Sequence, residues 1–183
     1  MFAAFLDTCA LVPMYLNDAL LRLAEADTYR PLWSPDVLGE LRNTLVVKLG
    51  VPVQAADRRI RQMRRYFPDA EVTGYESLVA AMTTDPKDRH VAAAFRGHAS
   101  VIVTANLADF PDAALAPCDV TAIHPDEFLL NQLDLCPQVV LACLHQQAAD
   151  YCQPSLAPDD LLDYLGRAGA NGFGTEVRRL LGR

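Results

Sequence analysis

The sequence predicts an α/β fold in which a parallel sheet is flanked by helices and followed by a small helical appendage. Predicted strands and helices alternate through the first 133 residues, which is typical of a parallel sheet. A run of β-branched residues at positions 100–104 gives this part a clear central strand. Only helices are predicted further on. We therefore expect an α/β domain over residues 1–133 and a C-terminal helical segment over residues 134–183.

The first strand is predicted from an apolar run over residues 2–6, which ends at Asp7. A run without polar positions is typical of a strand buried on both faces. Ser34 and Pro35 supply an N-cap and a first-turn proline, which predict a helix to about Leu49. The other elements predicted in this half are a helix over 16–26, a short strand over 29–33 and a helix over 53–67.

The second half contains the clearest strand, Ser-Val-Ile-Val-Thr over residues 100–104. Around it we expect strands over 70–73 and 119–123, and helices over 76–82, 85–98 and 125–133. In the tail, the pattern predicts helices over 139–151, 158–167 and 176–181.

Composition and charge narrow the class of protein. The chain has 183 residues and is 51% hydrophobic, so it can bury a core and is not a disordered chain. Its 16 basic and 23 acidic side chains give a formal net charge of −7. This charge argues against a protein that coats nucleic acid without specificity. It does not exclude an enzyme that cuts nucleic acid, because such enzymes gather carboxylates where they hold metal.

Five cysteines are present, and no two of them form a Cys-x-x-Cys pair. We therefore expect reduced thiols and no structural zinc site. No signal peptide precedes the cysteines, and the longest apolar runs are too short to cross a bilayer. The expectation is a cytoplasmic protein without a membrane-spanning segment.

Acidic and amide side chains gather at the ends of predicted elements. Asp7 follows the first strand, Asn106 and Asp109 follow the strand over 100–104, and Asp85 and Asp88 begin the helix that leads into it. Taken singly, Asp7, Asn106 and Asp109 are explained equally well by a cap or a turn, and Asp85 is explained better as a helix cap. Taken together, they could meet at one edge of the sheet, where crowded carboxylates repel unless a cation lies between them. Oxygen ligands favour Mg²⁺ or Mn²⁺.

Helical spacing adds information about two of the acidic side chains. Asp88, Val91, Ala92 and Phe95 recur at i, i+3, i+4 and i+7, so Asp88 is expected on the apolar face of its helix, lining a cleft. Glu40 lies at the margin of a buried stripe, where a glutamate is most often simply solvated.

Three pieces of the sequence resemble the PIN-domain family over about residues 1–130. They are Phe5-Leu-Asp7-Thr-Cys-Ala-Leu11, Asp85-Pro-Lys-Asp88-Arg-His-Val-Ala-Ala-Ala94 and Val101-Ile-Val-Thr104-Ala-Asn106-Leu-Ala-Asp109-Phe110, with Glu40 between the first two. The resemblance is closest to the VapC-like ribonuclease toxins of toxin–antitoxin pairs. The tail, with Leu156-Ala-Pro-Asp-Asp-Leu-Leu, also resembles the C-terminal helical segment of one subgroup.

The resemblance implies a five-stranded parallel sheet in the order 3-2-1-4-5 and a Mg²⁺- or Mn²⁺-dependent endoribonuclease. It also implies an RNA substrate, a cognate antitoxin and a possible homodimer. The family's three core acidic positions match Asp7, Glu40 and Asp88. Its fourth acidic position is occupied by Asn106, with Asp109 three residues further on, so either could complete the metal shell or orient the water. Thr8 and Thr104 would be polar supports, and Asp85 an accessory acid.

Arg58, Arg61 and Arg65 line up on the outward side of the helix predicted over 53–67. They are explained either as a solvated helix face or as a surface that contacts RNA phosphates. His90 lies two residues from Asp88, so we expect it to point elsewhere on its helix and not to bind metal. Cys9 is interpreted as a small buried thiol.

Two other functions stay open. A non-catalytic PIN-like module could bind RNA or a protein partner, and the asparagine at position 106 permits this. A phosphotransfer enzyme with Asp7 as nucleophile is less well supported, because such enzymes need a second aspartate two residues further on, where this chain has Cys9.

Overall fold

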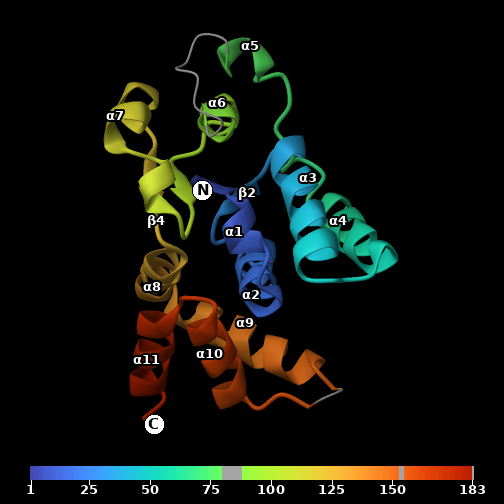
Figure 1. Ribbon diagram of the computed structural model, residues 1–183. Helices are drawn as coiled ribbons and strands as arrows, with labels where there is room; N and C mark the ends of the chain where they lie inside the picture. Colours follow the sequence, from blue (N-terminus) through green and yellow to red (C-terminus); the bar gives the residue numbers. More distant parts are fainter. Residues whose placement is uncertain (80–87, 153–154, 183) are drawn as a thin grey trace.

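A four-stranded parallel sheet forms the centre of the protein in the computed structural model, which describes residues 1–79, 88–152 and 155–182. Its strands are β1 (Ala3–Leu6), β2 (Arg30–Leu32), β3 (Val101–Val103) and β4 (Thr121–Ile123), in the order β2-β1-β3-β4 (Figure 1). All three pairings are parallel, so the α/β class with a parallel sheet is confirmed.

The predicted five-stranded sheet is wrong by one strand. The segment over residues 70–73 makes only an isolated parallel bridge, between Glu71 and Trp33, with one backbone hydrogen bond on each side of it. The reason lies in β2, because Ser34 caps helix α3 (Pro35–Asn43) immediately after Trp33. The neighbouring segment therefore meets a strand that has already ended. The bridge lies beside β2, where the order 3-2-1-4-5 places the third strand.

Strand β1 is central in the sheet and buried along its whole length. Successive side chains of a strand point to opposite faces, so Phe5 and its neighbours Ala4 and Leu6 contribute to both layers of the core. The ring of Phe5 lies 6.3 Å from the imidazole ring of His90, edge to face, on the side covered by helix α6 (Asp88–Arg96). The prediction that the apolar run at the start of the sequence forms a strand buried on both faces is therefore confirmed.

Two helical pairs follow the first two strands. Helix α1 (Thr8–Leu11) and helix α2 (Met14–Glu25) follow β1. Helix α3 continues into a π-helical turn, η1 (Thr44–Lys48), and packs against helix α4 (Val53–Tyr66) at one side of the molecule (Figure 1). The predicted helix from Ser34 to about Leu49 is thus present, with its last turn widened.

Short helices occupy the connections between the longer elements in the middle of the chain. They are α5 (Glu76–Val79), η2 (Leu107–Asp109), α7 (Asp112–Leu115) and η3 (Ala116–Cys118). The helix predicted over 85–98 is observed as α6 from Asp88 onwards, and Asp85 lies outside the described residues. The end of the helix predicted over 76–82 also falls outside them.

The C-terminal third is helical, as predicted. Helix α8 (Pro125–Leu135) is followed by α9 (Pro137–Asp150), α10 (Pro158–Arg167) and α11 (Asn171–Leu180). Helix α11 begins five residues before the start predicted at Glu176. Two glycines early in α11 made a helix improbable from the sequence. However, the carboxylate of Asp126 accepts hydrogen bonds from the backbone N–H groups of Gly172 (3.1 Å) and Phe173 (2.8 Å) and so caps this helix from a distance.

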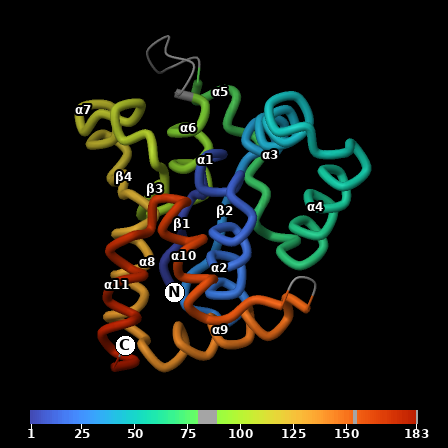
Figure 2. Tube along the Cα trace, turned by 60° about the horizontal axis from the view of Figure 1, so that its bottom comes forward, coloured from blue at the N-terminus to red at the C-terminus, as the bar shows by residue number. Residues whose placement is uncertain are grey.

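The helical segment packs against α2 at the end of the molecule away from α5 and α6, and α8 and α11 lie side by side (Figures 1 and 2). Polar contacts join the two parts. Gln147 donates to the backbone carbonyl of Tyr15 (2.9 Å), and Arg22 pairs with Asp150 (2.8 Å). Tyr15 also stacks on Tyr164, with ring centroids 4.4 Å apart.

Over the described ranges, no single helix is long and apolar enough to cross a bilayer. Helices α8 and α9 reach the required length and apolar composition only when taken together, and they are bent by 119° relative to one another.

The distant cap on α11 leads to a stability prediction. Replacing Asp126 by alanine leaves two backbone N–H groups without their acceptor, so the free energy of unfolding should fall by about 1–2 kcal/mol. The matched control is Glu127→Ala, because Glu127 is also in the first turn of α8 but is exposed. Urea unfolding of both variants measures the difference, and equal losses would contradict the cap.

Candidate active site

The register of the sheet brings two predicted site residues together. Leu6 of β1 is paired with Val103 of β3, so Asp7 and Thr104 are each one residue beyond the paired strands, at the same edge. The backbone N–H of Asp7 continues the ladder by donating to the carbonyl of Val103 (3.1 Å). The carboxyl ends of parallel strands are where open α/β sheets bind ligands.

Asp7 is a buried carboxylate whose two oxygens have different surroundings. Its side chain is only 1% exposed. Oδ2 accepts hydrogen bonds from the hydroxyl of Thr104 (2.8 Å) and the thiol of Cys9 (3.1 Å). Oδ1 is also buried and has no hydrogen-bond partner among the described residues. A buried charge needs a partner, so Oδ1 is the atom at which this site is incomplete.

Cys9 is part of the support of Asp7. Burial raises the pKa of the Cys9 thiol, and the negative charge of Asp7 raises it further. The thiol therefore stays protonated and donates to Asp7, while its sulfur accepts from the backbone N–H of Ala105 (3.0 Å). The thiol is partly buried and occupied by hydrogen bonds, which agrees with its interpretation as a structural residue.

Glu40 approaches the same point from helix α3. This helix begins with Ser34, whose hydroxyl accepts from the backbone N–H of Val37 (3.2 Å), and with Pro35 in the first turn. Glu40 Oε2 accepts a hydrogen bond from the hydroxyl of Thr8 (2.7 Å), the residue that follows Asp7. The side chain of Glu40 is 46% exposed, so it forms the open rim of a site whose floor is buried.

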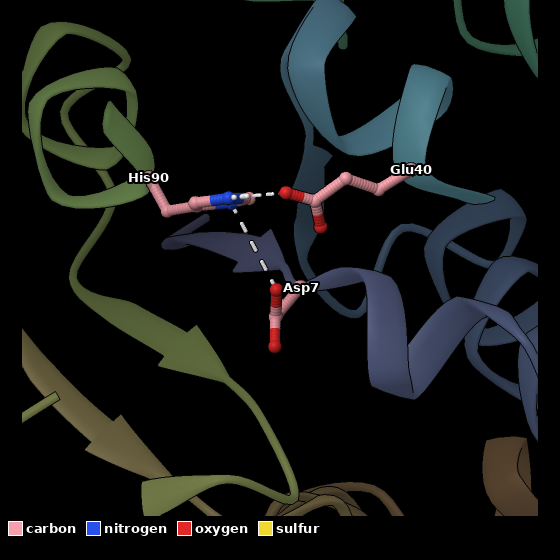
Figure 3. A group of neighbouring side chains, drawn as sticks. All are labelled: Asp7, Glu40 and His90. Atoms are coloured by element: carbon pink, nitrogen blue, oxygen red, sulfur yellow. Dashed lines mark hydrogen bonds and ion pairs between the residues drawn. The ribbon is translucent and has the colours of Figure 1, made fainter. Parts of the chain in front are cut away.

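His90 of α6 lies between the two carboxylates, which contradicts the expectation that it points away (Figure 3). Its side chain is 2% exposed. Nε2 is 3.2 Å from Glu40 Oε1, and Nδ1 is 3.8 Å from Asp7 Oδ1. One potential ligand atom from each of these three side chains lies within 4.8 Å of the other two.

The error about His90 arose because the buried surface of α6 is wider than the predicted apolar stripe. Val91 and Ala92 of that stripe are buried, but so are His90, Ala93 and Ala94, whereas Phe95 is 43% exposed. The alanines at i+3 and i+4 from the histidine were the signal in the sequence that could have placed it correctly.

The remaining predicted residues are only partly placed. Asp88 begins α6, but its side chain lies outside the described part of the structure, as does Asp85. Asn106 is exposed, and its backbone N–H donates to the Thr104 hydroxyl (3.1 Å). Asp109 is exposed in η2 and is not in the group formed by Asp7, Glu40 and His90. Which of the last two fills the fourth acidic position stays a prediction.

The arginines of α4 have different surroundings. Arg58, Arg61 and Arg65 are exposed on one side of the helix, as predicted. Arg59 instead turns inward, and its guanidinium donates to the backbone carbonyls of Leu11 and Val12 at the end of α1. It therefore fastens α4 to the helix that begins next to Asp7.

Fold and site together define a class of α/β proteins in which acidic side chains gather at the carboxyl ends of central parallel strands. Within this class, the family model described as PIN domain matches residues 3–108, which is more than half of the chain. The chain therefore belongs to the PIN-domain family. A second family model, described as VapC50 C-terminal domain, matches residues 125–179.

One curated relative is the protein named "Putative ribonuclease VapC50" of Mycobacterium tuberculosis (strain ATCC 25618 / H37Rv). The two sequences are 48% identical over 108 residues, which cover 58% of this chain and 63% of the relative. No solved structure matched the chain.

The hydroxyl of Thr104 is expected to stabilise the buried carboxylate. Thr104→Val keeps the shape of the side chain but removes the 2.8 Å hydrogen bond to Asp7. The free energy of unfolding in chelator-treated buffer should fall by about 1–3 kcal/mol, because a buried acceptor loses a donor. Thr121→Val, on the exposed side of β4, is the control and should change it by no more than about 0.5 kcal/mol. Equal effects in chemical denaturation would refute this role of Thr104.

Proposed function

We propose that the chain is a Mg²⁺- or Mn²⁺-dependent endoribonuclease that acts as the toxin of a toxin–antitoxin pair. The observation that carries the proposal is the buried Asp7 carboxylate, whose Oδ1 lacks a hydrogen-bond partner within the described residues and faces a site rimmed by Glu40. Membership of the PIN-domain family and the similarity to VapC50 support this assignment.

The donor set fits a divalent cation. Asp7 and Glu40 each present a carboxylate to one point, and the buried Oδ1 of Asp7 is an acceptor that a cation would satisfy. We assign the metal to Asp7, Glu40 and Asp88, the last on its match to the family's acidic position. An ion bound there would supply charge neutralisation for a phosphodiester and activation of a water molecule.

The protein's own groups fix the geometry of the carboxylates. The Thr104 hydroxyl and the Cys9 thiol hold Asp7 Oδ2, which leaves Oδ1 directed into the site. The Thr8 hydroxyl holds Glu40 Oε2. Asn106 or Asp109 would orient the attacking water or complete the set of ligands. Asp85 is assigned an accessory acidic role.

Hydrolysis by an activated water should leave a 3′-hydroxyl and a 5′-phosphate. Because the floor of the site is buried and Glu40 is half exposed, the RNA strand would enter from the side of α3. Helix α4 packs on α3, so its exposed Arg58, Arg61 and Arg65 are available to hold phosphates of the same strand.

The proposal extends to partners and organisation. A cognate antitoxin would inhibit the enzyme, a homodimer is possible for a member of this family, and the RNA substrate would place its action in the cytoplasm. We assign nuclease activity to residues 1–133 and treat residues 134–183 as a helical segment that packs on α2.

The central test is cleavage of a structured RNA by the purified full chain. Cleavage should require Mg²⁺ or Mn²⁺ and stop with EDTA. Asp7→Asn should lower the rate by more than about 100-fold, because loss of a ligand costs more than the 10- to 100-fold typical of outer contacts. Product ends are identified by labelling the 5′-phosphate.

Asp134→Asn is the matched control, since Asp134 is an exposed aspartate at the far end of α8 and should leave cleavage unchanged. Thermal unfolding must show that both variants are folded. Cleavage by Asp7→Asn at the rate of the unmodified protein would rule out the assignment. If the unmodified protein cleaves none of several RNAs but still binds them, a non-catalytic binding module is the better explanation.

The exposed arginines of α4 lead to a second prediction, which concerns the kinetics of RNA cleavage. Replacing Arg58, Arg61 and Arg65 together by glutamine should raise KM for RNA and leave kcat unchanged, because these groups would bind the backbone far from the reacting phosphate. The salt dependence of log KM should flatten by about 0.7 per lost phosphate contact on single-stranded RNA.

The control replaces Arg64, Arg178 and Arg179 by glutamine, which changes the net charge by the same amount. Each of these arginines is already paired with an acidic side chain. An equal rise in KM in both triple variants would mean that overall charge, and not this surface, determines RNA affinity.

A further inference from the structure

His90 is a buried histidine whose two ring nitrogens meet two different carboxylates. The imidazole is held edge to face against Phe5, the central residue of the buried strand. It is also 2% exposed, so water does not offer its nitrogens an easy alternative partner. Its polar atoms therefore have to be satisfied inside the site.

The contact with Glu40 determines which nitrogen carries the hydrogen in the neutral ring. Nε2 is 3.2 Å from Glu40 Oε1, and an ionised carboxylate can only accept hydrogen bonds. Nε2 therefore donates to Glu40. In neutral imidazole, the other nitrogen, Nδ1, then presents a lone pair.

Nδ1 and Asp7 Oδ1 face one another at 3.8 Å, which is too long for a hydrogen bond. Both atoms are buried, and neither has a hydrogen-bond partner in the part of the chain that the structure describes. Two acceptors that face each other repel. Two ligands of one divalent ion, each at about 2.1 Å from it, can lie up to about 4.2 Å apart, so the observed separation is within the reach of one ion.

We infer that His90 binds the divalent ion of the site through Nδ1, together with Asp7 Oδ1, while Glu40 orients the ring through Nε2–H. In this arrangement Glu40 acts on the ion through His90, in place of the direct contact assigned to it above. This inference rests on the proposed function. A histidine ligand that donates its other N–H to a carboxylate is a common arrangement in metal sites. Mg²⁺ is bound almost entirely through oxygen, whereas Mn²⁺ belongs to the first-row transition-metal series and accepts an imidazole nitrogen beside carboxylates more readily. The proposed nuclease therefore binds Mn²⁺ in preference to Mg²⁺, and His90 is the residue that sets this preference.

The test is spectroscopic and independent of cleavage. Tag-free full-length protein, stripped of metal, is titrated with MnCl₂, and electron paramagnetic resonance measures free Mn²⁺. Pulsed measurements on the bound ion should detect the hyperfine coupling of a ¹⁴N ligand. His90→Gln should abolish this coupling and weaken Mn²⁺ binding by about 10- to 100-fold. The affinity for Mg²⁺, measured by competition with MgCl₂, should change much less.

His145→Gln is the control, because His145 is exposed on α9, and it should keep both the coupling and the affinity. Circular dichroism in EDTA shows whether each variant is folded. Saturable Mn²⁺ binding that depends on Asp7 but shows no ¹⁴N coupling would overturn the role of His90, because the ring would then be an imidazolium paired with the carboxylates. That outcome leaves the proposed nuclease intact. Binding of Mn²⁺ that is unaffected by Asp7→Asn would overturn the metal site itself.

Discussion

The carboxylate of Asp7 is the constraint around which the site is arranged. Strand β1, which is buried along its whole length, ends immediately before Asp7. The carboxylate of Asp7 therefore lies where it has almost no contact with water. The protein satisfies one oxygen with a hydroxyl and a thiol and leaves the other facing an imidazole. An unsatisfied buried charge lowers stability, and a fold tolerates such a group where another property of the site requires it. Buried carboxylate, half-exposed glutamate and buried histidine bring three potential ligand atoms within 4.8 Å of one another, and the proposed cation site rests on this arrangement.

Local patterns were sufficient for most of the fold. Alternating elements and the Val-Ile-Val strand predicted a parallel sheet, and each of these signals is contained within a few residues. The two errors depended on distant parts of the chain. The fifth strand is reduced to a bridge because Ser34 starts a helix beside it. Helix α11 begins early because Asp126, 46 positions before Gly172, supplies its cap. The sequence identifies Ser34 as an N-cap, but neither its position beside residues 70–73 nor the approach of Asp126 to Gly172 follows from a local pattern.

Part of the candidate site could be predicted from the sequence. Asp7 and Thr104 follow strands, and parallel strands end at a common edge, so their proximity was expected from topology. Glu40 was assigned only through its resemblance to the family, since a residue at the margin of a helical stripe looks solvated. His90 was missed because its spacing of two residues from Asp88 places it on another side of an ideal helix. In the structure α6 is buried at every position from His90 to Ala94, so a side chain away from the predicted stripe still faces the site.

The C-terminal helices bear on this site through α2. Their contacts with the rest of the chain include the bond of Gln147 to Tyr15 and the ion pair of Asp150 with Arg22, both on α2. Helix α2 follows α1, which begins with Thr8, the residue that holds Glu40. Arg59 fastens the other end of α1 to α4. The short helix next to Asp7 is thus held between the tail and the arginine-bearing helix. Helix α1 is therefore the structural link between the tail, which packs on α2, and Thr8, which holds Glu40.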